Sequence, residues 1–126
     1  MLLMVDSLDT FGRYSGPATL LLSSLADGPK HGYALTRDIE HFAGIQIAPG
    51  TLYAAIDRLV ELGLVEGLAA EGRRRPYRIT AIGASALREH LEAQHQVTEV
   101  GLARLRSAER KTSPLVPALV AREPRG

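Results

Sequence analysis

Residues 49–65 read PGTLYAAIDRLVELGLV, and this stretch decides how the rest of the chain is interpreted. Its apolar side chains recur at helical spacing, which predicts a helix over Pro49–Leu62 with one buried face. That face consists of Leu52, Ile56, Leu59 and Val60. The opposite face starts with small residues, so the backbone of this helix can closely approach a bulky partner such as a DNA groove. It carries Gly50, Thr51, Ala54, Asp57, Arg58 and Glu61.

Two further helices are predicted upstream of this stretch. The first begins at Pro17, carries a stripe of leucines, and is ended by the Asp-Gly-Pro turn at residues 27–29. The second runs from about Gly32 to Phe42, with Gly44 as its C-terminal cap. Its apolar face consists of Leu35, Ile39 and Phe42. A short connector then leads into the helix that starts at Pro49, an order typical of a helix-turn-helix.

A β-hairpin is predicted after Gly63. Residues 64–68 and 77–80 are rich in strand-forming side chains, and a loop with glycine and arginine joins them. The strongest local charge cluster of the chain lies here, in Arg73, Arg74, Arg75 and Arg78. Such a hairpin tip can straddle a DNA backbone or enter a minor groove. The alternative is that the arginines form only a solvated loop.

A long final helix is predicted over residues 81–110, with Thr80 as its N-cap. Its apolar residues have a mean spacing near 3.5, and its length of roughly 45 Å exceeds the diameter of so small a domain. Part of the helix therefore needs a partner, and an identical chain is the simplest one. The predicted dimer contacts are Leu87, Leu91, Val97, Val100, Leu102 and Leu105.

These elements divide the chain into four parts. Residues 1–16 form an N-terminal arm, 17–80 a winged helix-turn-helix domain, 81–110 a dimerisation helix, and 111–126 a flexible tail with spaced prolines. The predicted fold class is mainly α with a small β-hairpin.

The composition excludes several kinds of protein. The chain of 126 residues contains no cysteine, so disulfides, thiolate metal sites and cysteine nucleophiles are absent, which suits a reducing cytoplasm. The formal net charge is only +1, so a nucleic-acid surface has to come from local clustering of basic residues. The sequence offers no signal peptide, membrane span, nucleotide loop or catalytic constellation. His41, His90 and His95 lack the spacing of a zinc site, and we predict no metal, cofactor or enzymatic activity.

Three motifs in the right order resemble those of the PadR family of transcriptional regulators. Residues 25–35, LADGPKHGYAL, are similar to its GPxHGY segment. Residues 49–53 together with 58–59 and 63–65 are similar to its PGTLY…RL…GLV segment, and residues 75–83, RPYRITAIG, to its wing. The resemblance covers about Ala18 to Leu91. The arm and the tail are longer than is typical of the short subgroup, which has a single C-terminal helix.

The resemblance implies a dimeric, DNA-binding transcription factor, usually a repressor, that is often released from a palindromic operator by a small-molecule effector. The predicted DNA contacts are Lys30, Tyr33, Gly50, Thr51, Tyr53, Ala54, Asp57, Arg58, Arg73, Arg74, Arg75 and Arg78.

Several of these residues also have a structural interpretation. Thr51 can bind a phosphate or cap its helix, and Tyr53 can reach a phosphate or sit half-buried in the core. Tyr33 can bind a phosphate or help to pack the second helix. Asp57 and Arg58 can read bases or form a solvated charged pair. The alternative function for the whole chain is a winged-helix protein-interaction module that does not bind DNA.

Overall fold

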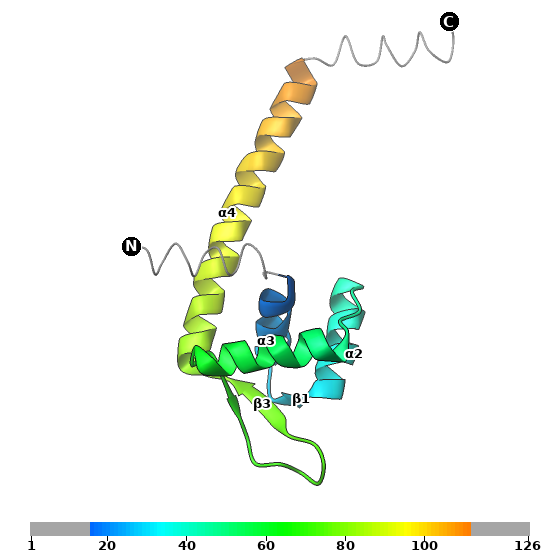
Figure 1. Cartoon of the computed structure of the whole chain (residues 1–126). Helices are drawn as coiled ribbons and strands as arrows, with labels where there is room; N and C mark the ends of the chain where they lie inside the picture. Colours follow the sequence, from blue (N-terminus) through cyan, green and yellow to red (C-terminus); the bar gives the residue numbers. More distant parts are fainter. Residues whose placement is uncertain (1–15, 112–126) are drawn as a thin grey trace, which may run out of the picture. The chain divides into compact units, whose positions relative to one another are not determined.

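The computed structural model describes residues 16–111, and Figure 1 shows the order of their elements. The predicted arm and tail therefore lie outside the described residues, except at their borders. Gly16 is already helical and the last helix ends at Lys111, while the predicted division into four parts stays a prediction. The architecture is mainly helical with one small sheet, and the predicted fold class is confirmed.

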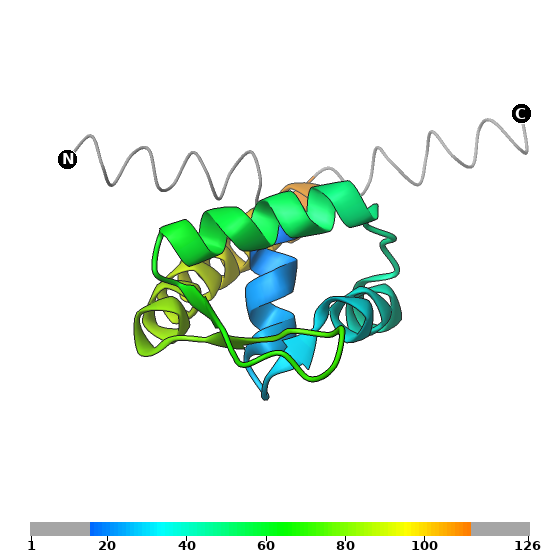
Figure 2. The same cartoon turned by 60° about the horizontal axis from the view of Figure 1, so that its bottom comes forward.

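Three helices form the first part of the chain. Residues 16–25 are helical, followed by α2 (Gly32–Ala43) and α3 (Pro49–Glu61). In Figures 1 and 2, α3 crosses the helix of residues 16–25. Gly44 caps α2 in the left-handed conformation (φ 69°), and its N–H donates to the carbonyl oxygen of Glu40. Both helices therefore begin and end close to their predicted positions.

The sheet has three strands rather than the predicted two. Strands β2 (Val65–Gly67) and β3 (Pro76–Ile79) form the hairpin, and β1 (Lys30–His31) pairs antiparallel with the other edge of β3. The strand order is thus β1-β3-β2. Because β1 is directly followed by α2, this third strand ties the start of α2 to the hairpin. The hairpin extends from the C-terminal end of α3 (Figure 2).

The core brings together all these elements. Leu52, Ile56 and Leu59 of α3 are buried with leucines of the first helix and of α2. Two residues predicted on buried faces are not buried: Val60 is 41% exposed and Phe42 48% exposed. Both lie at the edge of an apolar face, near the end of their helix, so neighbouring elements do not cover them.

The last helix, α4, spans Ala81–Lys111. Thr80 caps it as predicted, because its Oγ1 accepts from the backbone N–H of Gly83 at 3.0 Å. The chain divides into two compact units within this helix, between Glu89 and His90. No helix among residues 16–111 is both long enough and apolar enough to cross a membrane.

Candidate nucleic-acid interface

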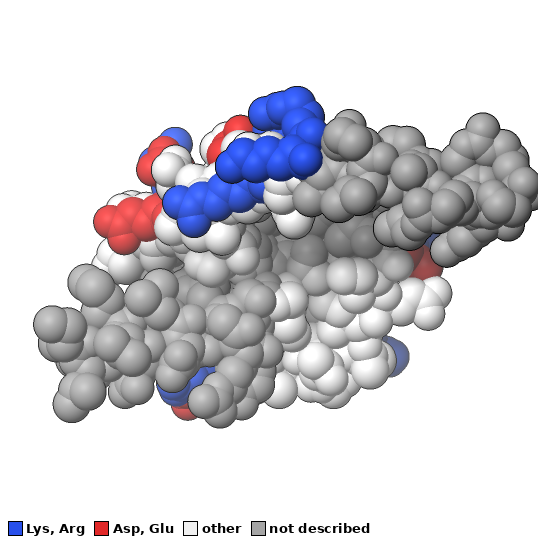
Figure 3. Space-filling model, turned by 90° about the horizontal axis from the view of Figure 1, so that it is seen from above, with Lys and Arg blue, Asp and Glu red and all other residues white. Residues whose placement is uncertain are grey.

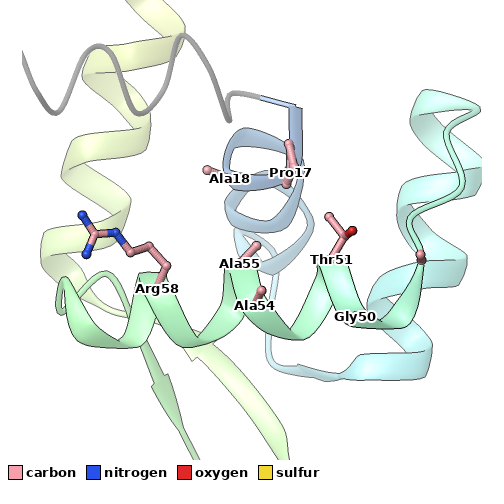
Figure 4. A pocket seen from close by; sticks show the side chains of 8 residues that line it. Pro17, Ala18, Gly50, Thr51, Ala54, Ala55 and Arg58 are labelled. Atoms are coloured by element: carbon pink, nitrogen blue, oxygen red, sulfur yellow. The ribbon is translucent and has the colours of Figure 1, made fainter.

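The outward face of α3 is lined by small side chains. Gly50, Thr51 and Ala54 are all exposed, as the sequence predicts. Beside them a shallow hollow of about 750 Å³ lies between α3 and the first turn of the helix of residues 16–25 (Figure 4). It is lined by Pro17, Ala18, Ala48, Gly50, Thr51, Ala54, Ala55 and Arg58. A partner can therefore come close to the backbone of α3 along most of its length.

The surroundings of Thr51 and Arg58 bear on their possible roles in α3. The N-cap of α3 is Ala48, which makes no side-chain cap bond, so Thr51 does not cap the helix. Its hydroxyl is exposed and available to a phosphate. Arg58 forms an ion pair with Glu61 at 3.5 Å, and base reading by Asp57 and Arg58 stays a prediction. Because both partners of this pair are well exposed, the contact stabilises the protein little, and a DNA base or phosphate can replace it.

The four arginines of the hairpin are not equivalent. The Nη1 of Arg75 donates to the carbonyl oxygen of Leu68 at 3.0 Å, which holds Arg75 along its own hairpin. Arg78 makes two hydrogen bonds to the carboxylate of Glu66, at 2.8 and 3.0 Å, in the register that places the two residues opposite each other. Arg73, by contrast, has no hydrogen bond or ion pair within the described part of the chain, and Arg74 only approaches His31. The tip therefore presents two available guanidinium groups, Arg73 and Arg74.

Lys30, just before α2, and Tyr33, in its first turn, already make hydrogen bonds within the chain. Lys30 donates to the carbonyl oxygen of Ser24 and to the carboxylate of Asp27, and this contact lowers the pKa of Asp27. Tyr33 is 63% exposed, so it does not pack α2 against the core. Its hydroxyl accepts from Arg37 at 2.9 Å, which leaves the O–H free to donate to a ligand. Of the two residues, Tyr33 is the more available for a phosphate.

A polar hollow of about 260 Å³ lies where the start of α2, α3 and the hairpin tip meet, and we call it the arginine hollow. It is lined by His31, Gly32, Tyr33, Tyr53, Arg73, Arg74, Arg75 and Tyr77. Burial, with a smaller effect of Tyr53, raises the pKa of Tyr77, and its hydroxyl is protonated at neutral pH, as a tyrosine ordinarily is. The sequence did not single out His31 or Tyr77 as contacts, and His31 joins the arginines only through the pairing of β1 with β3.

Gly32 makes room for Tyr53 in this hollow. A Cβ atom added at Gly32 would lie 2.1 Å from the hydroxyl oxygen of Tyr53. Tyr53 is 45% exposed, so its ring can swing out into solvent instead of breaking the fold. The arrangement explains why a glycine stands at the first position of α2, where a side chain would otherwise be tolerated.

We expect Gly32→Ala to lower the stability by about 1 kcal/mol and to displace Tyr53 from the hollow. Thermal unfolding monitored by circular dichroism measures the first effect. In a Tyr53→Ala background the same substitution should be close to neutral, because the atom that it displaces is gone. An equal loss in both backgrounds would contradict the contact.

Four of the predicted dimer contacts are exposed apolar residues in the second unit, on α4. Leu91, Leu102 and Leu105 are 39%, 48% and 60% exposed, and Val97 is 71% exposed. Leu87 differs: it is 6% exposed and belongs to the core of its own chain, so it is not available as a dimer contact. The remaining predicted contacts stay predictions.

Basic side chains gather locally despite the small net charge. On the face drawn in Figure 3, Lys and Arg side chains lie next to one another, with acidic side chains beside the group. Among residues 16–111 no group of three or more His, Asp or Glu side chains could hold a metal ion.

A helix pair followed by an arginine-tipped hairpin defines a winged helix-turn-helix protein. The model of the transcriptional regulator PadR-like family matches residues 21–89, and the chain belongs to this family of transcription regulators, which bind DNA. The predicted family is thereby confirmed.

Individual relatives agree with this assignment. The transcriptional regulator Rv3488 of Mycobacterium tuberculosis is 38% identical over 80 residues, which are 61% of this chain and 74% of that protein. An uncharacterised 37.1 kDa protein in a Streptomyces fradiae transposon is 46% identical over 68 residues, 54% of this chain but only 20% of that protein. A PadR family transcriptional regulator from Eggerthella lenta is 31% identical, with a TM-score of 0.57, covering 83% of this chain and 96% of that one.

Proposed function

We propose that this protein is a homodimeric, sequence-specific transcriptional repressor of the cytoplasm that a small-molecule effector releases from DNA. Each protomer would place α3 in a major groove, with two half-sites separated by about one helical turn, roughly 34 Å. The observation that carries the proposal is that α3 has an exposed face of small side chains, while its Tyr53 lines the same hollow as two available arginines, Arg73 and Arg74.

The roles of the site residues follow from their surroundings. Thr51, Tyr33 and the arginines at the hairpin tip would position the protein on the DNA backbone, because phosphate contacts carry no sequence information. Base reading would rest on Ala54, which can touch a thymine methyl group, and on Asp57 and Arg58.

Effector release would act through α4. A ligand that changes the angle between two protomers also changes the distance between their α3 helices, and a mismatch with the half-site spacing lowers affinity. The chain contains no tryptophan, so an effector would bind among aliphatic side chains and phenylalanine. We propose no cofactor.

Selection of bound sequences from a random or genomic DNA library tests the proposal. We expect a palindrome with a fixed half-site spacing and binding that weakens steeply with salt. Absence of any salt-sensitive DNA binding would instead favour a protein-interaction module.

For the hairpin, we expect Arg74→Ala to weaken binding to all DNA sequences and to lower the slope of log K against log salt by about one. The reason is that one phosphate contact, with its released counterion, is lost. Arg88→Ala, which removes an exposed arginine of α4, is the matched control and should leave the slope unchanged. An unchanged slope for Arg74→Ala would exclude a phosphate contact at this residue.

A further inference from the structure

The imidazole ring of His31 has two neighbours, and each of them is an N–H donor that needs an unprotonated ring nitrogen. Its Nδ1 accepts a hydrogen bond from the backbone N–H of Ala34 at 3.4 Å and so caps α2. Its Nε2 lies 3.5 Å from Nη1 of Arg74. A guanidinium group has only donors, and a neutral imidazole has only one unprotonated nitrogen.

His31 therefore cannot satisfy both neighbours. While Nδ1 accepts from Ala34, the ring proton is on Nε2, and two N–H donors face each other across 3.5 Å. If Nε2 accepted from Arg74 instead, the cap of α2 would be lost. The arginine hollow, into which both groups open, is lined by no Asp or Glu that could accept from them.

We propose that one backbone phosphate of the bound DNA occupies the arginine hollow and accepts hydrogen bonds from both His31 Nε2 and Arg74 Nη1. This inference rests on the proposed DNA binding and identifies the phosphate that joins α2 to the hairpin. A phosphate oxygen has several acceptor sites and a negative charge, so it satisfies two facing donors at once. The hollow, at about 260 Å³, holds a phosphate group together with several waters of roughly 30 Å³ each.

The other polar groups of the hollow suit the same ligand. The O–H of Tyr33 is free to donate, because its oxygen already accepts from Arg37. Tyr77 keeps its proton at neutral pH and is a second hydroxyl donor. Arg73, which has no partner among the described residues, adds positive charge at the rim. His31 thus has a positioning role: it fixes one phosphate with respect to the first turn of α2 and to the hairpin.

Replacement of single DNA phosphates tests the proposal. Each backbone phosphate of a selected half-site is changed to a neutral methylphosphonate, and the affinity of the full-length protein is measured. For the wild type we expect affinity to fall about tenfold at the phosphate that occupies the arginine hollow, as well as at the other contacted phosphates. Arg74→Ala and His31→Asn should each lose affinity with unmodified DNA and become insensitive to the modification at that same position.

The substitution His31→Asn separates binding from folding. Asparagine is itself a good N-cap residue, so α2 should remain capped and the thermal midpoint nearly unchanged, while the Nε2 donor is removed. Arg88→Ala should keep the wild-type sensitivity to the methylphosphonate.

Two outcomes would overturn the proposal while leaving DNA binding intact. In one, His31→Asn remains as sensitive to the methylphosphonate as the wild type. In the other, His31 and Arg74 act at different phosphates. If the wild-type protein shows no salt-sensitive DNA binding, the proposed function fails and this inference with it.

Discussion

Gly83→Ala is expected to destabilise the folded protein by about 3 kcal/mol and to lower its thermal midpoint by roughly 10 °C or more. A Cβ atom at this position would lie 2.0 Å from the carbonyl oxygen of Leu64 and 3.0 Å from Cγ1 of Ile79. The carbonyl belongs to the backbone where α3 leads into β2, and it already accepts from the N–H of Thr80 at 3.0 Å. It cannot move away without separating α4 from the sheet.

Gly101→Ala is the matched control for this prediction, because it makes the same change in the same helix. No atom lies within 4 Å of a Cβ placed at Gly101. Alanine has a higher helix propensity than glycine by up to about 1 kcal/mol, so this variant should be neutral or slightly stabilised. Thermal and urea unfolding of the two variants measure the difference. Equal midpoints would show that α4 does not pack against Leu64 as closely as the structure has it.

The helices of the fold could be predicted because their signals are local. Pro49 is suited to a first helical turn, the apolar spacing defines the buried face, and Thr80 and Gly44 are common cap residues. The outward face of α3 follows from the same periodicity. For these features, the residues that decide the structure are only three or four positions apart.

What could not be predicted depends on contacts between distant parts of the chain. Strand β1 has only two residues and exists because Lys30 pairs with Tyr77, far along the sequence. The membership of His31 in the arginine hollow follows from this pairing. The apolar character of Val60 predicts that it is buried, but its burial depends on whether a neighbouring element covers the edge of α3.

The availability of the hairpin arginines also depends on contacts that the sequence pattern does not show. In the sequence they form one cluster of like residues. Their availability is decided by the strand register, which places Arg78 opposite Glu66, and by the position of the Leu68 carbonyl beside Arg75. A sequence pattern can therefore predict a basic hairpin tip, but not which of its side chains are free.

The second large effect is expected from charge introduced on the apolar face of α4. At about 100° per residue, Leu91, Leu102 and Leu105 fall within about 60° of one another around the helix. Val97 and Val100 fall outside this sector, so a partner must cover more than one face to reach them. Exposed leucines repeated on one side of a helix are typical of a helix–helix contact. We therefore expect the double variant Leu102→Glu/Leu105→Glu to be monomeric.

Loss of the dimer should have a large effect on DNA binding. Two linked reading helices gain about 10²- to 10⁴-fold in affinity over one, because binding of the second half-site becomes intramolecular. The double variant should therefore bind a full palindrome that much more weakly, and about as well as it binds a single half-site. Sedimentation equilibrium measures the mass, and titration of full and half operators measures the affinity.

Gln96→Glu provides the control, because it adds a negative charge on the opposite side of the same exposed helix. It should leave both the mass and the operator affinity close to the wild-type values.

If the double variant remained dimeric, the leucine face would not be the contact, and dimerisation would have to use another surface. If it became monomeric and yet bound the full operator as tightly as the wild type, the two half-sites would not be read together. The proposed release of the operator through the angle between protomers would then have no mechanism, since that angle affects affinity only when both α3 helices are bound at once.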